Sequence, residues 1–397
     1  MSGPVTHRWP EATADPSRGE DSLTQRWLVF GDTKVPYLYG VACADRLAEA
    51  ILDRLGDLDA VLFVVDSRAT EHTHAVVARL SQRVRVEVLV LESSERAKTL
   101  ATVASILDTA TAHGLTRRSV IVAMGGGTVG NLAGLAAALL FRGIRLVHLP
   151  TTPVAAFDSV ISIKQGVNLN AGKNLCGTYF APALIACDLT WLTTVPAADL
   201  RTGLAEMVKN VLVIAPELEA KLVGAFRMLQ AAPSVALRDL LEIGIDAKAP
   251  WLADDPHERR AAVIFEYGHT AGHAIEFTSG GAISHGEAVA WGMLVAAEVA
   301  RRRHGLPDHE VARHHRLVAL LDLPDPAHRL AALDRQALRS VLEKDNKRGH
   351  APCAADEVLM VLPGPAPAPS ATTPPLVAVP TEAVLDAIDV VRSRGGM

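Results

Sequence analysis

Cysteine and aromatic residues are scarce in this sequence of 397 residues, and long apolar runs are missing. The four cysteines are scattered and form no Cys-x-x-Cys pair, which argues against a disulfide framework and favours a reduced, cytoplasmic setting. No apolar run reaches the roughly 18 residues of a membrane span. The first residues also lack the apolar stretch of a signal peptide. Because residues 1–25 are polar and have little to bury, we expect a disordered tail there.

An excess of positive charge is also lacking. The formal net charge is −5, with 49% hydrophobic and 21% charged residues, which is ordinary for a soluble globular protein. We therefore expect neither nucleic acid nor an anionic membrane as a partner. A chain of this length is too long for one small core, so two domains are the natural expectation.

The first half of the chain alternates short apolar runs with amphipathic segments. Runs of this kind, separated by helices, are typical of buried parallel strands in an α/β fold. We predict an α/β domain over residues 26–187. Its strands are expected at 61–65, 86–91, 119–124 and 146–149, and its helices at 44–55, 74–82 and 97–112.

Helical periodicity replaces the strand pattern in the second half, from residue 196 to about 345. We predict a mainly α-helical metal- and substrate-binding domain over 188–397, with a ligand cleft where the domains meet, near 186–188. The Pro-rich segment 363–375 is incompatible with a helix or a central strand and predicts an exposed loop. A last helix is expected near 381–393.

A glycine-rich turn, GlyGlyGlyThrValGlyAsn at 125–131, follows a predicted strand and opens a predicted helix at 131–140. Glycines let the backbone approach a pyrophosphate, and the start of a helix attracts anions. Asp66 ends the strand 61–65, where a carboxylate could hold ribose hydroxyls. Taken alone, the turn could be only a tight turn, and Asp66 could be only a helix cap.

A second group of residues has the chemistry of a metal site. Glu206 and Lys209 share one helix face, as do His269 and His273, and His285 precedes another predicted helix. A glutamate with two or three histidines suits a divalent metal such as Zn²⁺, and three protein ligands leave positions open for substrate oxygens. The alternative is a surface ion pair beside histidines that cap or pack.

Basic residues recur in a third group of segments, which could converge on a phosphorylated sugar. Singly, each lysine could equally be a solvated surface charge. These segments are 158–168, 172–174 and 344–348, together with Lys248.

Taken together and in order, these motifs resemble the dehydroquinate synthase superfamily of sugar-phosphate cyclases, over roughly residues 60–350. The resemblance rests on GlyGlyGly-x-x-GlyAsn, ProThrThr at 150–152, LysAsn at 173–174, GluMetValLys, GlyHisThr-x-GlyHis and HisGlyGluAla. It implies an N-terminal NAD-binding α/β domain and a helical C-terminal metal-binding domain.

The resemblance also implies which residues bind the metal and the cofactor. The ligands of a Zn²⁺ or Co²⁺ ion would be Glu206, His269 and His285. NAD would be held by Asp66, Glu95, Lys98, Gly127, Thr128, Val129, Gly130, Asn131, Thr151, Thr152, Ser162, Lys164, Lys173 and Asn174.

For the substrate, the resemblance implies acid–base catalysis by Lys164 and Glu266. Arg142, in PheArgGlyIle, would reach a phosphate across a dimer interface, which implies a homodimer. The substrate-binding residues would be Arg142, Asp158, Lys209, Lys248, His273 and Lys347.

Two departures narrow the choice within the superfamily. Dehydroquinate synthase binds a carboxylate with an arginine and an asparagine just before its GlyHisThr, where this sequence has Ala262 and Glu266. A pocket that lacks the guanidinium because of Ala262 and gains an anion from Glu266 repels a carboxylate but suits a sugar hydroxyl. GluTyrGlyHisThr and AspAsnLysArgGly are similar to the 2-deoxy-scyllo-inosose synthases of aminoglycoside antibiotic biosynthesis. These cyclise glucose 6-phosphate through transient oxidation at C4, phosphate elimination, reduction and an intramolecular aldol reaction.

Other functions stay open on the sequence alone. One alternative is another sugar-phosphate cyclase, either dehydroquinate synthase or a sedoheptulose 7-phosphate cyclase. A second is a metal-dependent NAD alcohol dehydrogenase with a similar two-domain plan. A third, a non-catalytic NAD-binding sensor, is disfavoured because the metal ligands and Lys164 are all present.

Overall fold

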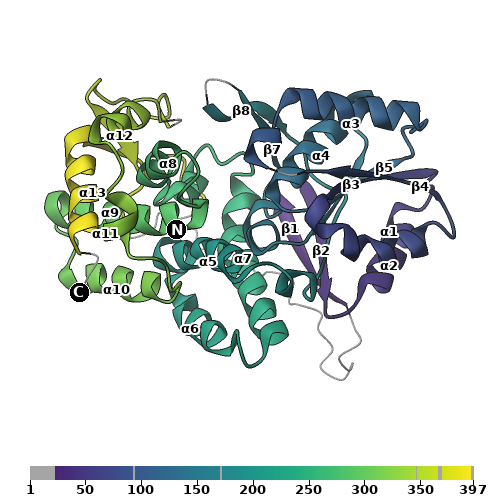
Figure 1. The fold of residues 1–397 in the computed structure, drawn as a ribbon, viewed down its shortest axis with the longest axis horizontal. Helices are drawn as coiled ribbons and strands as arrows, with labels where there is room; N and C mark the ends of the chain where they lie inside the picture. Colours follow the sequence, from purple (N-terminus) through teal and green to yellow (C-terminus); the bar gives the residue numbers. More distant parts are fainter. Residues whose placement is uncertain (1–22, 93, 170–171, 346, 365–368, 395–397) are drawn as a thin grey trace, which may run out of the picture.

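The computed structural model describes residues 23–92, 94–169, 172–345, 347–364 and 369–394, which form two domains side by side (Figure 1). The α/β domain comes first in the chain and the helical domain second, as predicted. Most of the expected tail lies outside the described residues, and the first strand begins at Thr24.

The α/β domain is built on a seven-stranded sheet in the order β1-β2-β9-β6-β5-β3-β4. All neighbouring strands are parallel except β1 and β2, which form an antiparallel pair. The strands are β1 (Thr24–Phe30), β2 (Thr33–Gly40), β3 (Ala60–Asp66), β4 (Arg85–Leu91), β5 (Val120–Gly125), β6 (Arg145–Pro150) and β9 (Leu184–Asp188).

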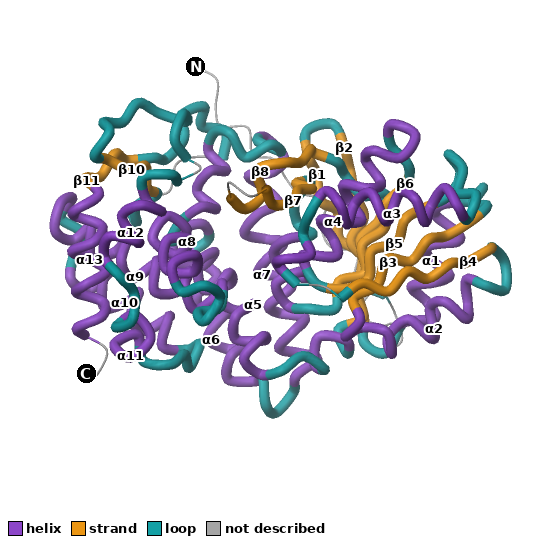
Figure 2. Tube along the Cα trace, turned by 45° about the horizontal axis from the view of Figure 1, so that its top comes forward, coloured by secondary structure: helices purple, strands orange, loops and turns teal. Residues whose placement is uncertain are grey.

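Helices cover both faces of this sheet, as Figure 2 shows. Alternate residues of β3 point to opposite sides, so Phe63 packs with one pair of helices and Leu62 with the other. The first pair is α1 (Ala44–Leu55) and α2 (Thr70–Leu80), and the second is α3 (Leu100–Ala112) and α4 (Gly127–Leu139).

The four apolar runs are confirmed as strands, with two corrections to the detail. Strand β4 is an edge strand with several exposed side chains, so it is less buried than we expected. Helix α4 begins at Gly127 rather than at residue 131, so the glycine-rich turn is itself the start of the helix. The shift matters because it places the free N–H groups of α4 directly at the turn.

A hairpin that the sequence analysis did not predict projects from the α/β domain. It consists of β7 (Lys164–Leu169) and β8 (Gly172–Tyr179), and β7 packs against α4. The hairpin carries Lys164, Lys173 and Asn174, so it brings three of the predicted site residues to the domain border.

The helical domain packs around α9, the long buried helix that contacts α5, α8, α10 and α13. The described part of segment 363–375 has no helix or strand, as expected. None of the described helices combines the length and the apolar character that crossing a bilayer requires. The elements are α5 (Ala197–Lys209), α6 (Glu219–Met228), α7 (Pro233–Asp254), α8 (His269–Thr278), α9 (His285–His304), α10 (Asp308–Ala319), α11 (Pro326–Leu330), α12 (Arg335–Leu342), α13 (Thr381–Arg394) and a small sheet of β10 (Glu357–Met360) and β11 (Val377–Pro380).

The chain passes from one domain to the other after β9, which ends at Asp188. This strand end lies beside the predicted limit at 187/188, and the exact limit stays a prediction. Strands β1 and β2 contribute to both domains. Leu28 on β1 and Tyr37 on β2 pack into the same core as helices α5, α7 and α9 of the helical domain.

Candidate active site

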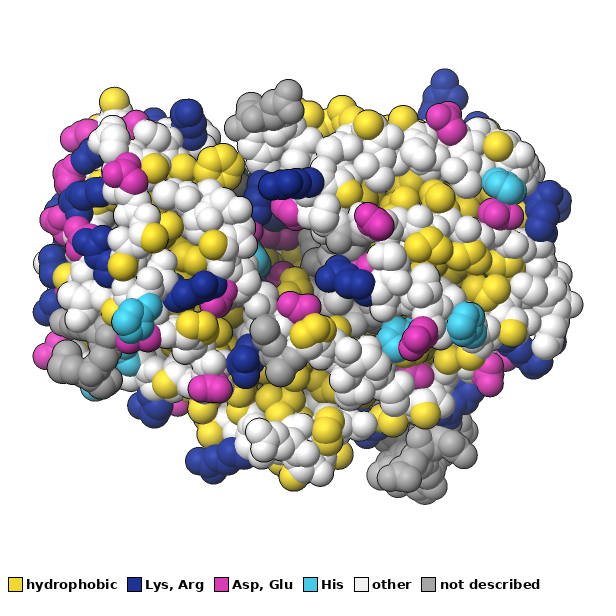
Figure 3. All heavy atoms as spheres, in the orientation of Figure 1, with side chains coloured by type: hydrophobic (Ala, Val, Ile, Leu, Met, Phe, Trp, Pro, Cys, Tyr) yellow, Lys and Arg dark blue, Asp and Glu magenta, His cyan; other side chains and the backbone are white. Residues whose placement is uncertain are grey.

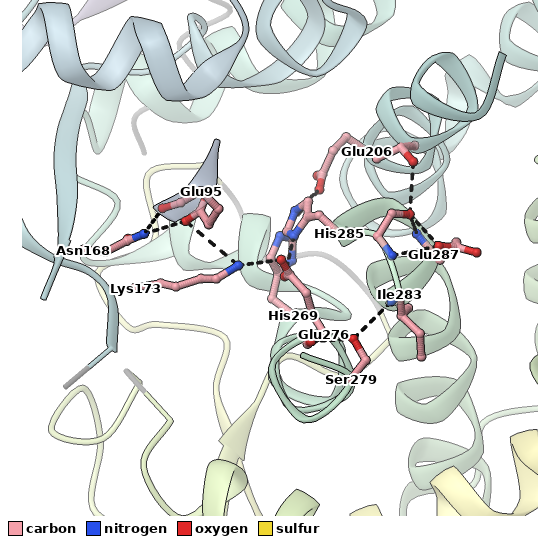
Figure 4. Close-up of polar contacts among 12 residues, drawn as sticks. Glu95, Asn168, Lys173, Glu206, His269, Glu276, Ser279, Ile283, His285 and Glu287 are labelled. Carbon is pink, nitrogen blue, oxygen red and sulfur yellow. Dashed lines mark hydrogen bonds and ion pairs between the residues drawn. The ribbon is translucent and has the colours of Figure 1, made fainter. Parts of the chain in front are cut away.

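Three side chains from three helices converge where the domains meet (Figure 4). Glu206 comes from the end of α5, and His269 and His285 are the first residues of α8 and α9. Glu206 Oε1 lies 3.5 Å from His269 Nε2 and 3.4 Å from His285 Nε2. One ligand atom from each residue lies within 4.8 Å of the others.

This spacing fits a divalent metal. Nitrogen and oxygen ligands bind Zn²⁺ at about 2.1 Å, and at tetrahedral angles two such ligands lie about 3.4 Å apart. Glu206 Oε2 is paired with the buried ammonium group of Lys209, so the other oxygen, Oε1, is the one that faces the two imidazoles. The three residues predicted as metal ligands are therefore brought together in an arrangement that could hold one ion.

Both imidazole rings are fixed through the nitrogen that faces away from the cluster. His269 Nδ1 lies 3.0 Å from the Tyr267 carbonyl oxygen, and His285 Nδ1 lies 3.1 Å from Glu276 Oε2. A ring that donates from Nδ1 keeps the Nε2 lone pair free for a metal. This outer support is typical of metal-binding histidines, and it was not visible in the sequence motif.

Two glycines explain why the helices meet so closely. Gly268 precedes α8 with a φ of +77°, and a Cβ there would lie 2.8 Å from Met293 Cγ on α9. At Gly286, a Cβ would lie 2.4 Å from the Thr202 carbonyl oxygen on α5. Larger residues would push the three ligand-bearing helices apart. The glycines of GlyHisThr and HisGlyGlu are therefore part of the metal-site geometry.

One ion pair within the cluster is buried. Lys209 forms an ion pair with Glu206, and both side chains are 2% exposed. Burial opposes ionisation of both groups, but Lys209 and His269 hold the pKa of Glu206 well below its usual range, and Glu206 and Asp158 raise the pKa of Lys209. Lys209 is therefore not the surface charge that the sequence allowed.

His273 lies one turn after His269 on the same helix face. Its ring centroid is 5.2 Å from that of His269 and 6.2 Å from that of His285. Burial, with help from the charge on His269, lowers the pKa of His273 to about 3, although Glu266 opposes the shift. His273 is therefore neutral at physiological pH and could donate or accept a hydrogen bond beside the cluster.

A pocket opens next to this cluster, and Figure 3 shows the surface hollowed between the domains, with acidic and basic side chains in and around the hollow. The hairpin forms one wall, and the loop between α7 and α8 forms the other. The pocket is lined by Lys164, Tyr179, His257, Glu258, Arg259, Val263, Glu266, Lys347 and His350.

The two predicted catalytic residues both lie in this pocket and both have ionic partners. Lys164 Nζ lies 2.5 Å from Glu258 Oε2, and Lys347 Nζ lies 3.5 Å from Glu266 Oε2. Burial lowers the pKa of Lys164, but the carboxylates of Glu258 and Glu266 raise it by more, so the pKa lies above its usual value. Burial likewise raises the pKa of Glu266, but Lys347 and His269 bring it well below its usual range.

Glu258 was missed by the sequence analysis. It has a φ of +51°, which is unusual for a residue other than glycine. The buried Asp255 carboxylate supports the loop by accepting hydrogen bonds from the N–H groups of Arg259, Arg260 and Ala262. The loop thus turns the Glu258 carboxylate toward Lys164, a contact that no local motif indicates.

Two further predicted substrate residues, Asp158 and Lys248, form an ion pair outside the lining of the pocket. Lys248 Nζ lies 2.6 Å from Asp158 Oδ1, and the lysine also stands 5.0 Å from the Phe265 ring centroid. Asp158 belongs to a π-helical turn after β6, whereas Lys248 lies on α7. The pair therefore joins the π-helical turn of the α/β domain to α7 of the helical domain.

The glycine-rich turn on the opposite wall is tightly packed against β3. A Cβ at Gly125 would lie 2.9 Å from Asp66 Cβ, and a Cβ at Gly127 would lie 3.3 Å from Ser159 Oγ. The Asp66 carboxylate accepts a hydrogen bond from Arg68 N at 3.0 Å and pairs with the Arg68 guanidinium. Asp66 thus caps a short helix, as in the alternative reading, while lying beside the turn predicted to bind NAD.

The remaining predicted cofactor residues mostly contact one another. Lys98 Nζ lies 2.5 Å from Asn174 Oδ1, and Asn168 Nδ2 lies 2.7 Å from Glu95 Oε1 (Figure 4 shows the second contact). These contacts join the hairpin to the short 3₁₀ helix Glu95–Ala97. Lys173 reaches across to the helical domain instead, where its Nζ lies 2.5 Å from Glu276 Oε1.

Other predicted cofactor residues have internal partners in the turn and hairpin. The Asn131 amide donates to Gly127 O and accepts from Gly166 N, so it joins α4 to β7. Thr151 N donates to Gly125 O, and Thr152 Oγ1 accepts from Ala155 N. Ser162 Oγ lies 3.3 Å from Glu258 Oε1, on the substrate side. Thr128, Val129 and Gly130 lie in the first turn of α4.

Arg142 is one of several predicted substrate residues that do not line the pocket. It is exposed in the turn that follows α4, with a φ of +68°. Its predicted role requires contact with a second copy of the chain, so this role stays a prediction.

Comparisons with known proteins agree with this architecture. The models of the N-terminal and C-terminal domains of 3-dehydroquinate synthase match residues 88–202 and 203–348. A 2-deoxy-scyllo-inosose synthase of Streptomyces lividus is 41% identical over 373 residues, which cover 93% of this chain and 96% of the relative.

Solved structures give the same picture. A 2-deoxy-scyllo-inosose synthase complexed with carbaglucose-6-phosphate, NAD⁺ and Co²⁺ is similar, with a TM-score of 0.79 and 33% identity, over 93% of this chain and 99% of that one. A 2-epi-5-epi-valiolone synthase from Streptomyces hygroscopicus subsp. jinggangensis 5008, with NAD⁺ and Zn²⁺ bound, has a TM-score of 0.76 and 26% identity, over 93% and 99% of the two chains.

Proposed function

The chain belongs to the 3-dehydroquinate synthase family, and from this premise we propose that it converts glucose 6-phosphate to 2-deoxy-scyllo-inosose and phosphate. The reaction balances with no external oxidant, because the substrate is oxidised at C4 and later reduced at the same carbon. The observation that carries the proposal is Glu266, an acidic residue in the pocket beside Lys164 and Lys347. A carboxylate there accepts hydrogen bonds from sugar hydroxyls and repels the carboxylate of a dehydroquinate precursor.

NAD⁺ and a divalent metal are the cofactors of the proposed reaction. NAD⁺ supplies a reversible hydride acceptor, and Zn²⁺ or Co²⁺ at Glu206, His269 and His285 supplies a Lewis acid that acidifies substrate hydroxyls. The donor set and its spacing fit such an ion. Both metals accept this nitrogen and oxygen ligand set, so the native metal stays open.

The cofactor wall is proposed to consist of the glycine-rich turn and the hairpin. Gly127 to Asn131 present the start of α4, whose N–H groups and helix dipole favour a pyrophosphate. Thr151 and Thr152 lie beside that turn, and Lys98 and Asn174 lie where the hairpin meets the short 3₁₀ helix Glu95–Ala97. Because Lys98 already contacts Asn174, we infer that these two residues exchange partners when the dinucleotide binds.

We assign proton transfer to Lys164 and Glu266. Glu258 and Glu266 raise the pKa of Lys164, so its amine is mostly protonated and can donate a proton near neutral pH. Lys347 and His269 keep Glu266 ionised, so its carboxylate can accept one. We also assign the orientation of sugar hydroxyls to the Lys248–Asp158 pair and to Lys209, which are mostly buried polar groups near the domain border.

The phosphate is proposed to bind at the outer part of the pocket. Lys347 is buried and faces Glu266, and with Arg259 and Lys164 it gives the pocket three cations against the two carboxylates Glu258 and Glu266. His273 adds a neutral imidazole from α8. Release of this phosphate by elimination would make the enzyme a carbon–oxygen lyase.

A homodimer would complete the site if Arg142 of a second copy reached the phosphate. Light scattering should then give a mass twice that of the chain, and a monomeric mass would refute this part. The described cysteines are all free thiols, which supports the cytoplasmic setting that we propose.

The central experiment is product analysis after incubation with glucose 6-phosphate, NAD⁺ and Co²⁺. We expect one phosphate per carbocycle and no lasting NADH absorbance, whereas an alcohol dehydrogenase would accumulate NADH without releasing phosphate.

Glu266→Gln should sharply slow turnover, because its amide accepts protons poorly. Glu242→Gln, in an unrelated ion pair on α7, is the matched control and should turn over normally. Normal turnover by Glu266→Gln would refute the assigned role.

A further inference from the structure

Glu276 on α8 has a position that the proposed reaction does not explain. One carboxylate oxygen, Oε2, lies 3.1 Å from His285 Nδ1, and the other, Oε1, lies 2.5 Å from Lys173 Nζ. Its side chain is only 14% exposed. Figure 4 shows Glu276 between the metal ligand on one side and the hairpin lysine on the other.

We propose that Glu276 is a positioning residue, which orients His285 for the metal and, through Lys173, makes the binding of metal and of NAD⁺ favour each other. This inference rests on the proposed function, because it assumes that both cofactors bind in this cleft.

The first half of the proposal follows from how the two imidazoles are held. His269 is 11% exposed, and its Nδ1 contacts a backbone carbonyl that the fold fixes. His285 is 35% exposed, and its Nδ1 contacts the side chain of Glu276. A half-buried ring at the start of a helix can turn about its χ2 angle, so His285 depends on its carboxylate partner more than the better-buried His269 depends on its carbonyl.

The second half follows from the origin of Lys173. This lysine lies on β8 of the α/β domain, whereas Glu276 lies on α8 of the helical domain. Lys173 Nζ is also 4.0 Å from Glu95 Oε1, which accepts a hydrogen bond from Asn168. A chain of polar contacts therefore runs from the predicted cofactor wall, through Lys173 and Glu276, to His285.

An ion pair that is partly exposed contributes little to stability by itself. Its effect here is on geometry, because it connects a metal ligand to a hairpin in the other domain. A dinucleotide that orders the hairpin would also fix Lys173, and through it Glu276 and His285. By linkage, the metal must then tighten NAD⁺ binding by the same factor.

The first test titrates metal-free protein with Co²⁺ and follows the visible absorption bands of the bound ion. Glu276→Ala should weaken Co²⁺ binding by about 10- to 100-fold, the usual effect of losing an outer partner of a metal-binding histidine. Glu276→Gln should lose less, because its amide oxygen still accepts a hydrogen bond from Nδ1. Both variants should also change the Co²⁺ bands, which a purely structural role would leave alone.

The matched control is Glu242→Gln, which also removes a half-buried carboxylate paired with a lysine (Lys221, at 2.8 Å). It should bind Co²⁺ with wild-type affinity and spectrum. Wild-type binding and spectrum in folded Glu276→Ala would overturn the positioning role. If the wild-type protein itself took up no Co²⁺, the proposed function would fail instead, so the two failures are distinguishable.

The second test measures Co²⁺ affinity with and without saturating NAD⁺. The wild type should bind Co²⁺ several-fold more tightly when NAD⁺ is present, and Lys173→Met should lose this gain even at NAD⁺ concentrations that saturate the variant. Lys221→Met, from the control pair, should keep it. An unchanged gain in Lys173→Met, or no gain in the wild type, would overturn the coupling.

Discussion

The two walls of the cleft differ in how their functional side chains are held. On the helical wall, His269 and His285 are oriented by Tyr267 and Glu276 and leave the coordinating nitrogens free. On the α/β wall, predicted cofactor residues pair with one another, as Lys98 does with Asn174. Under the proposed function, the metal site is already arranged for its ion, whereas the cofactor site would exchange internal contacts for contacts with the dinucleotide.

The difference extends to packing. Glu206 and Lys209 are buried, and glycines let α5, α8 and α9 approach closely around them. Most residues of β8, in contrast, are half-buried or exposed. We therefore expect changes on the helical wall to cost metal affinity and stability, and changes on the α/β wall to act mainly on cofactor binding.

The largest effect should follow removal of the metal carboxylate. Glu206→Ala takes away one of three ligands and leaves Lys209 buried without its partner. Outer partners alone are worth about 10- to 100-fold in metal affinity, so the loss of a ligand should exceed that range. Calorimetric Co²⁺ titration should show this loss, with turnover falling to that of chelator-treated protein. Wild-type Co²⁺ affinity would mean that the ion binds elsewhere.

A smaller effect should distinguish alanine substitutions at two glycines, one on each wall, by their free energies of unfolding. A methyl group at Gly286 would meet the Thr202 backbone at 2.4 Å, so Gly286→Ala should lower the free energy of unfolding by about 1–3 kcal/mol. At Gly127 the nearest atom is the Ser159 hydroxyl at 3.3 Å, which can move. Gly127→Ala should keep near-wild-type stability in urea unfolding but bind NAD⁺ more weakly. Equal destabilisation by both would remove the contrast between the walls.

The smallest effect concerns the charge of Lys164. Glu258 and Glu266 raise the pKa of this amine, so Glu258→Gln should lower it. A lower pKa means more neutral amine at mildly alkaline pH, and acylation of Lys164, measured by mass spectrometry, should become several-fold faster. Lys221 in Glu242→Gln serves as the matched comparison. Unchanged acylation of Lys164 would mean that Glu258 does not control its charge.

The sequence predicted those parts of the fold that local patterns determine. The run around Phe63 is continuous and β-branched, so β3 could be recognised, and the order of the domains followed from such runs. Strand β8 was missed because glycine, asparagine and threonine interrupt its apolar residues. The edge position of β4 was missed because strand order depends on contacts that the sequence pattern does not contain.

The same limit applies to the candidate site: residues in short local motifs could be predicted, and residues whose partners are distant in sequence could not. The three proposed metal ligands could be named because each lies in a short motif that resembles the family, and the structure brings Glu206, His269 and His285 together. Glu258 and Glu276 could not, since each acts through a residue distant in sequence, Lys164 or Lys173. Asn131 was predicted as a cofactor residue, and the structure adds a contact to Gly166 that only the folded hairpin creates.

The most direct test is anomalous diffraction at the cobalt edge from crystals of the protein loaded with Co²⁺ and NAD⁺. The account predicts one strong peak at about 2.0–2.2 Å from Glu206, His269 Nε2 and His285 Nε2, on the side of the cleft that faces the cofactor. A peak at other residues, or no peak in this cleft, would contradict it.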